Sequence, residues 1–194
     1  MHHIHHTEAF ILKSSNVREA DKVLYLYTRE LGLIKATAQG IRKLGSKLRF
    51  ALQDFTYAKV DLVRGRATWR VTSAQPIDSL IYIKKDRASY AIVHNTSRLL
   101  LRLVQGEEAH EKIFNDLKHA FFFLNQIHVP RGERRATELS LVLRILHHLG
   151  YTSGQGDMTP VTMNEYMGER LEYTKEKELR IISEINRALK ATQL

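Results

Sequence analysis

The chain has 194 residues, of which 43% are hydrophobic and 26% charged, and its formal net charge is +9. This length and composition predict one large or two small folded domains and exclude a disordered chain. The absence of cysteine excludes disulfides, thiolate metal sites and a cysteine nucleophile, and it is consistent with a reducing cytosol. No apolar run approaches the roughly 18 residues of a membrane span, and the first residues lack the pattern of a signal peptide. The positive charge favours a polyanionic partner, either nucleic acid or an anionic membrane surface.

The N-terminus carries a histidine cluster, formed by His2, His3, His5 and His6. Histidine is a common metal ligand, but a structural site normally draws its ligands from more than one segment. Terminal residues are also usually mobile. We therefore expect adventitious metal binding here and no resident metal.

The first eighty residues have the pattern of short β-strands separated by turns. Runs rich in β-branched and aromatic residues, some of them alternating, predict strands over 8–13, 22–28, 33–38, 55–63 and 68–74. Arg64-Gly65-Arg66 is a hairpin signal, and Pro76 should end the last strand. A short helix is expected near 47–52, between the third and fourth strands. Five strands with a helix at that point are typical of the oligonucleotide/oligosaccharide-binding (OB) fold.

The rest of the chain has helical periodicity. Apolar residues at helical spacing predict helices near 86–104, 107–127, 134–149 and 176–190, with a Gly-rich loop over 152–160. We therefore predict an α+β protein with two domains. Residues 1–80 should form a five-stranded OB-fold β-barrel that binds nucleic acid, and residues 81–194 an α-helical C-terminal domain, both free of zinc.

Positive charge is concentrated within the first domain. Residues 35–70 contain nine Lys and Arg but only two Asp and Glu. Such a local excess attracts a phosphate backbone, and we favour binding over the alternative of a solvated face that keeps the protein soluble. Tyr25, Tyr27, Tyr57 and Trp69 could offer stacking faces to bases, but Trp69 is better explained as barrel core. The candidate residues for binding a nucleic-acid backbone are Lys35, Arg42, Lys43, Lys47, Arg49, Arg64, Arg66 and Arg70.

No motif indicates covalent catalysis. The glycines and cations of 40–46 do not match a phosphate-binding loop of nucleotidases, and we interpret this segment as a flexible basic loop. His147 and His148 lie near the end of a predicted helix, where the helix dipole favours a cation. Paired carboxylates and nucleophile motifs are also lacking. We therefore expect a binding protein that is not an enzyme and that uses no cofactor.

An ordered set of short segments runs through the first eighty residues. These segments are EAFILKS at 8–14, EADK at 19–22, YTRELG at 27–32, AQGIRK at 38–43, SKL at 46–48, ALQDF at 51–55 and RGR at 64–66. A second set lies in the helical part: RR at 134–135, EL at 138–139 and HLGY at 148–151. The first set resembles the opening of the RecO family of bacterial DNA repair and recombination mediators, and the second is similar to a helix of that family's C-terminal domain.

The resemblance implies a cytoplasmic, nucleoid-associated protein that binds single- and double-stranded DNA and anneals complementary strands. It also implies that single-strand-binding protein is displaced so that RecA can load, without a nucleotide cofactor. The family's partners are RecR and the acidic C-terminal tail of single-strand-binding protein. Many relatives carry a four-cysteine zinc motif after the LGY segment, whereas 152–160 contains no cysteine, so zinc is not expected.

Two further hypotheses follow. Arg134 and Arg135 could pair with a carboxylate of an acidic tail while Leu139 and Val142 line an apolar groove, although ordinary helix amphipathicity explains the same pattern. The alternative to a mediator is an OB-fold scaffold, or an RNA-binding module, without mediator activity. Strand annealing in the absence of ATP would separate these functions.

Overall fold

A computed structural model describes residues 3–66, 68–153, 156–163 and 167–192. Its contacts divide the chain into two compact units. The first contains Met1–Ile81 and Val104–Glu111, and the second contains Tyr82–Leu103 and Lys112–Leu194.

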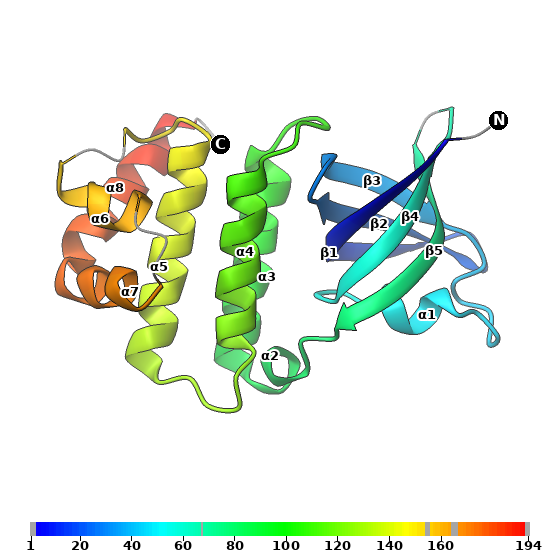
Figure 1. Ribbon diagram of the computed structural model, residues 1–194, viewed down its shortest axis with the longest axis horizontal. Helices are drawn as coiled ribbons and strands as arrows, with labels where there is room; N and C mark the ends of the chain where they lie inside the picture. Colours follow the sequence, from blue (N-terminus) through cyan, green and yellow to red (C-terminus); the bar gives the residue numbers. More distant parts are fainter. Residues whose placement is uncertain (1–2, 67, 154–155, 164–166, 193–194) are drawn as a thin grey trace. The chain divides into compact units, whose positions relative to one another are not determined.

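The first unit is built on a closed five-stranded barrel with the strand order β1-β2-β3-β5-β4 (Figure 1). All neighbouring strands pair antiparallel except β3 and β5, which pair in parallel over two residue pairs only. A short helix, α1 (Leu48–Ala51), lies between the third and fourth strands in the chain. The strands are β1 (Ile4–Val17), β2 (Asp21–Thr28), β3 (Gly32–Ala38), β4 (Tyr57–Arg64) and β5 (Trp69–Asp78).

Strand β1 closes the barrel because it pairs with β4 through its first half and with β2 through its second half. A register shift between Ile11 and Lys13 marks a bulge, which lets a long strand bend from one partner to the other. The barrel interior is filled by alternating apolar side chains from every strand, and Trp69 is among them with 4% of its surface exposed. The prediction of a core role for Trp69 is therefore confirmed.

Two strands are longer than the sequence pattern suggested. β1 begins at Ile4, so His5 and His6 belong to a paired strand and not to a free terminus, whereas His2 lies outside the described residues. β5 continues through Pro76 to Asp78, although Pro76 was expected to end it. β5 pairs with β3 only at Trp69 and Arg70. A proline further along has no partner on that side and breaks no ladder hydrogen bond there.

The second unit is helical, and α5 packs against α3, α6, α7 and α8. Its core combines apolar residues of α3, α5, α6 and α8, including Leu103, Leu143 and Ile181. The helices are α2 (Ile81–Lys85), α3 (Arg87–Leu103), α4 (Glu111–Leu124), α5 (Arg131–His148), α6 (Thr159–Thr162), α7 (Met167–Glu176) and α8 (Glu178–Ala191), with a 3-10 turn, η1 (Gly156–Met158). An N-terminal five-stranded barrel followed by helices is the predicted fold class, which is confirmed.

Helix α7 was not anticipated, and the expected 152–160 loop contains η1 and the start of α6. The reason for missing α7 is that its buried face is partly polar. Arg170 and Thr174 are buried there beside Leu171, so the usual apolar stripe is interrupted. None of the helices in the described part of the chain is long and apolar enough to span a membrane.

Candidate nucleic-acid interface

The outer surface of the barrel carries rows of side chains that the strand register defines. Residues directly opposite one another on paired strands point to the same side of the sheet. Lys13 of β1, Tyr25 of β2 and Lys35 of β3 are opposite one another in this way, which places a tyrosine between two lysines. Both lysines are exposed and Tyr25 is partly exposed.

The next row leads to an arginine-lined hollow. Val23 of β2 lies opposite Thr37 of β3, and Thr37 lies opposite Arg70 of β5. The hollow has a volume of about 280 Å³ and lies where β3 and β5 pair only briefly. Its cationic side chains are Arg18, Arg66 and Arg70, and its one carboxylate is Asp21. That carboxylate is already engaged, because its Oδ1 accepts the Gly40 N–H at 2.8 Å.

We call the exposed cations of these rows and of the hollow the basic face: Lys13, Arg18, Lys35, Arg66 and Arg70. The strand pairing brings together three of the predicted residues, Lys35, Arg66 and Arg70. Lys13 and Arg18 were missed because they precede the charge-dense stretch. Arg18 sits in the turn between β1 and β2 with a φ of +55°, a position with no strand or helix signature.

The basic loop after β3 is attached to that same turn. The Arg42 N–H donates to the Ala20 carbonyl oxygen at 3.0 Å, and its guanidinium donates to the Glu19 carbonyl oxygen at 3.0 Å. Turns from Gly40 to Lys43 and from Lys43 to Ser46 then shape the loop. The expected flexible segment is therefore tied to the barrel at its start. Lys43, Lys47 and Arg49 are exposed along it.

Arg64 differs from the other candidates because it is already paired. Its guanidinium donates to a Glu107 carboxylate oxygen and lies over the Trp69 ring, 4.9 Å from the ring centroid. Both partners of this ion pair are about half exposed, so the pair is weakly stabilising. Arg64 therefore contributes less free charge to a phosphate than Arg66 or Arg70.

The aromatic candidates separate by burial. Tyr27 and Tyr57 are 0% and 1% exposed, and neither they nor Trp69 can stack on a base. Tyr57 is used structurally, because its hydroxyl donates to Glu8 Oε2 at 2.6 Å, and burial together with that carboxylate raises the pKa of Tyr57. Tyr25 is the one of the four that remains accessible.

A second side of the barrel is acidic by comparison. Around a hollow of about 520 Å³ lie Glu8, Glu30 and Asp61, with Arg29 and Lys59 between them. Arg29 is bound by Glu8 at 2.7 Å, and His6 Nδ1 lies 2.6 Å from Asp61 Oδ1. Among the described residues no group of three or more His, Asp or Glu could hold a metal ion. This side has no excess of free cations.

The predicted peptide-binding residues divide between a surface and the core of the helical unit. Leu139 is 6% exposed in the helical core, and Val142 packs against that core. Arg134 pairs with Asp86 at 2.6 Å, and Arg135 pairs with Glu138 and Glu178. Both arginines border a hollow of about 380 Å³ whose apolar wall comes from Ala88, Ala91 and Ile92 of α3. The groove beside the arginines is thus formed by α3 and not by Leu139 and Val142.

Comparison with known proteins points to one family. Residues 1–80 match the family model described as the Recombination protein O N-terminal domain. The chain is 29% identical over 118 residues to the DNA repair protein RecO of Clostridium novyi, which covers 61% of this chain and 46% of that protein. It is 36% identical over 108 residues to the DNA repair protein RecO of Dehalococcoides mccartyi, covering 56% and 43%.

A third relative extends the match into the helical unit. The DNA repair protein RecO of Caldanaerobacter subterraneus is 26% identical over 145 residues, which covers 75% of this chain and 58% of the relative. The chain thus spans about half the length of the curated relatives that it matches. The barrel, the ordered segments and these matches agree that residues 1–80 are similar to the N-terminal domain of the RecO family.

Proposed function

We propose that this chain is a DNA-binding recombination mediator of the RecO type, acting in the bacterial cytoplasm at the nucleoid. In this role it binds single- and double-stranded DNA, anneals complementary strands and helps RecA load onto DNA coated by single-strand-binding protein. The matched relatives are DNA repair proteins. The observation that carries the proposal is the basic face on the barrel.

The basic face has the features that binding to a DNA backbone requires. Lys and Arg neutralise phosphates without reading sequence, and an exposed aromatic ring stacks on any base. Lys13, Tyr25 and Lys35 provide a ring flanked by two cations, and the arginine hollow provides a concave site for a phosphate. The exposed cations of the attached loop, Lys43, Lys47 and Arg49, extend the positive surface.

The proposed activity needs binding energy and no covalent step. Annealing is accelerated when two strands are held on a positive surface that screens their mutual repulsion. Such a surface can also compete with single-strand-binding protein for the same phosphates. The proposal therefore includes no nucleotide cofactor and no catalytic residue.

Charge reversal on the basic face tests this placement. Lys35 and Arg70 are exposed strand residues, so Lys35→Glu with Arg70→Glu should leave the barrel folded. Each lost phosphate contact removes about 0.7 to 0.9 from the slope of log K against log salt. We expect the double variant to bind DNA at least tenfold more weakly and with a flatter salt dependence, measured by fluorescence anisotropy.

The matched control is Lys59→Glu, an exposed strand lysine on the acidic side of the barrel. It should change DNA affinity little. Because Lys59→Glu makes one charge reversal and the double variant makes two, the control is compared with Lys35→Glu alone. Equal losses in Lys59→Glu and Lys35→Glu would mean that only total charge matters, and the basic face would then be the wrong site. Strand annealing without ATP separates a mediator from an OB-fold scaffold or an RNA-binding module, since neither of these needs to accelerate it.

A partner site on the helical unit is the second candidate. An acidic tail ending in an aromatic residue matches the α3–α5 hollow, whose wall is apolar and whose rim carries three arginines, Arg131, Arg134 and Arg135, against one carboxylate, Glu138. This is our proposed contact for the tail of single-strand-binding protein, and RecR is proposed as the other protein partner. Ala91→Glu should abolish binding of an acidic peptide ending in Phe. Arg98→Gln, the same change in net charge on the same helix outside the hollow, should retain binding.

A further inference from the structure

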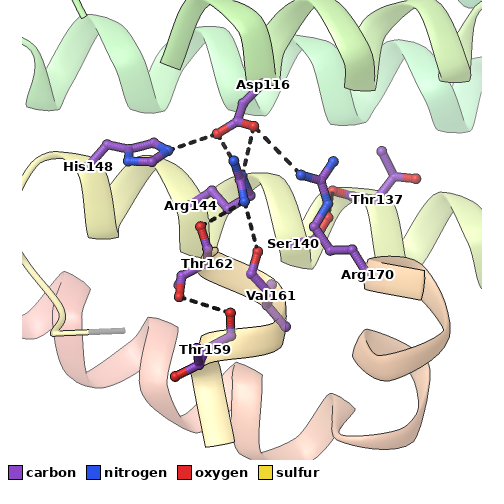
Figure 2. Close-up of polar contacts among 9 residues, drawn as sticks. All are labelled: Asp116, Thr137, Ser140, Arg144, His148, Thr159, Val161, Thr162 and Arg170. Carbon is purple, nitrogen blue, oxygen red and sulfur yellow. Dashed lines mark hydrogen bonds and ion pairs between the residues drawn. The ribbon is translucent and has the colours of Figure 1, made fainter. Parts of the chain in front are cut away.

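A buried cluster of charged side chains joins three helices of the second unit (Figure 2). Asp116 comes from α4, Arg144 and His148 from α5, and Arg170 from α7. The side chains of Asp116, Arg144 and Arg170 are 4%, 8% and 3% exposed. Charges are rarely buried to this extent unless each of them is paired.

The charge of Asp116 is committed to Arg144 and His148. Arg144 Nε donates to Oδ1 at 2.7 Å and lies 2.8 Å from Oδ2, and His148 Nε2 lies 3.0 Å from Oδ2. Burial by itself would raise the pKa of Asp116, but the hydrogen bonds from His148 and Arg144 hold it below its usual value. Arg144 Nη1 also donates to the carbonyl oxygens of Val161 and Thr162, at 3.1 and 2.7 Å.

Arg170 is left without an equivalent partner. Its Nη1 lies 3.6 Å from Asp116 Oδ1, which is too far for a hydrogen bond. Within the described part of the chain, its buried Nε and Nη1 have no hydrogen-bond partner. Burial and the neighbouring Arg144 charge lower the pKa of Arg170. Among the described residues, two buried guanidinium groups therefore share the carboxylate of Asp116. A buried charge that is only partly compensated is strongly unfavourable.

The cluster lines a hollow that is open to a ligand. Arg144, Arg170, Asp116 and His148 border it together with exposed Lys112 and His119. Its volume of about 170 Å³ is below the roughly 300 Å³ at which sites for drug-sized molecules begin. The space suits a small ion, or the charged end of a larger molecule. The lining favours an anion, because Lys112 and the two arginines face one carboxylate.

We propose that this hollow binds a phosphate group, which supplies the negative charge that Arg170 lacks. A guanidinium donates two parallel hydrogen bonds to phosphate oxygens, so Arg170 is suited to hold the group from inside. Lys112 would meet it from the exposed rim. A phosphate monoester carries close to two charges near neutral pH, which matches this excess better than a carboxylate does. The ligand is either free phosphate or the terminal phosphate of a nucleic-acid strand.

Thermal unfolding of the whole chain in inorganic phosphate tests the proposal, with sodium chloride at equal ionic strength as the reference. A ligand that binds only the folded state raises Tm. At ten times its Kd, the expected rise for a chain of this length is about 3–6 °C. Arg170→Met should lose this rise. Without phosphate its Tm should be no lower than that of the parent chain, because it removes a buried charge that shares its only described carboxylate with Arg144. Arg98→Met, an exposed arginine of α3, should behave like the parent chain.

The outcomes separate binding from a purely structural role. No phosphate-dependent rise in the parent chain, or an equal rise in Arg170→Met, would overturn the proposal. An equal rise with acetate would overturn the choice of phosphate. If circular dichroism shows that Arg170→Met does not fold, Lys112→Met at the rim replaces it, and its phosphate Kd by calorimetry should be at least threefold weaker. A 5′-phosphorylated oligonucleotide that outcompetes its unphosphorylated form identifies strand ends as the source.

Discussion

At the scale of the residue, Gly32 occupies a position that only glycine can hold. Its φ is +64°, and an added Cβ would lie 2.0 Å from the Glu108 carbonyl oxygen. Gly40 has the same φ, but the nearest atom to an added Cβ is the flexible Lys43 Cδ at 3.6 Å. Substitutions at these two glycines therefore distinguish the cost of backbone strain alone from the cost of strain together with a steric collision.

We expect Gly40→Ala to lower the free energy of unfolding by about 1–2 kcal/mol through strain alone. Gly32→Ala should cost more, roughly 2–4 kcal/mol, because the Glu108 backbone must also move. Urea unfolding of the two variants measures the difference. Equal losses would show that the segment around Glu108 yields without cost.

Asp86 predicts a dependence of stability on pH. It precedes α3, and its Oδ2 accepts the Ser89 Oγ–H at 2.7 Å and the Ser89 N–H at 3.0 Å. These bonds, with the Arg134 ion pair, lower the pKa of Asp86 from 3.8 to about 2. Because the pKa is lower in the folded state, this stabilisation is complete above pH 4 and disappears as the pH falls towards 2.

Asp86→Asn isolates that contribution. The variant should be less stable than the parent chain by about 1 kcal/mol at pH 7, a value discounted because the Asp86 side chain is 43% exposed. The difference in stability between the parent chain and Asp86→Asn, measured by thermal unfolding, should narrow between pH 4 and pH 3. If this difference stays constant over the interval, the lower stability of Asp86→Asn comes from a changed cap geometry and not from the lost carboxylate charge.

At the scale of the element, Arg144 is the link between α5 and its neighbours. It pairs with Asp116 of α4 and donates to the last carbonyl groups of α6. Arg144→Met leaves Asp116 without its closest partner and should destabilise the chain by about 3–5 kcal/mol. Arg135→Met is the matched control on the same helix. It removes only exposed ion pairs and should cost less than 1 kcal/mol.

Hydrogen exchange locates the effect of Arg144→Met. Amides of α6 and α7 should lose protection first, because these elements pack on α5 around the arginine. Uniform loss of protection across the whole chain would show instead that the cluster stabilises the chain globally.

At the scale of the whole molecule, the net charge of +9 and the basic face make different predictions about DNA. A positive charge spread over the whole surface attracts DNA weakly at every point of that surface. The five cations of the basic face would instead make a defined number of contacts with DNA phosphates. If Lys13, Arg18, Lys35, Arg66 and Arg70 each neutralise one phosphate, the slope of log K against log salt should be near −3.5 for single strands and −4.5 for duplexes. A slope near −1 for both would leave most of these residues outside the interface.

The sequence by itself determined the architecture of this protein, because that information is local. Alternating apolar residues predicted the barrel strands, and helical spacing predicted α3, α4, α5 and α8. Ordered short segments indicated the family whose N-terminal model matches residues 1–80. It also located the stretch of chain that contains much of the positive charge. Prediction was wrong where the tertiary structure overrides a local signal. Pro76 continues β5 because β3 does not pair with the strand there, and α7 has a buried arginine where an apolar residue is usual.

Only the tertiary structure decided which charges act together. Lys13 and Lys35 are 22 residues apart, yet strand register places Tyr25 between them. Arg64 and Arg66 are neighbours in the sequence, yet Arg64 pairs with Glu107 while Arg66 lines the hollow. No sequence motif marks Arg170. That its buried Nε and Nη1 lack a hydrogen-bond partner among the described residues appears only when α4, α5 and α7 bury it beside Arg144. Charge pairing depends on distances through space, which a linear pattern does not contain.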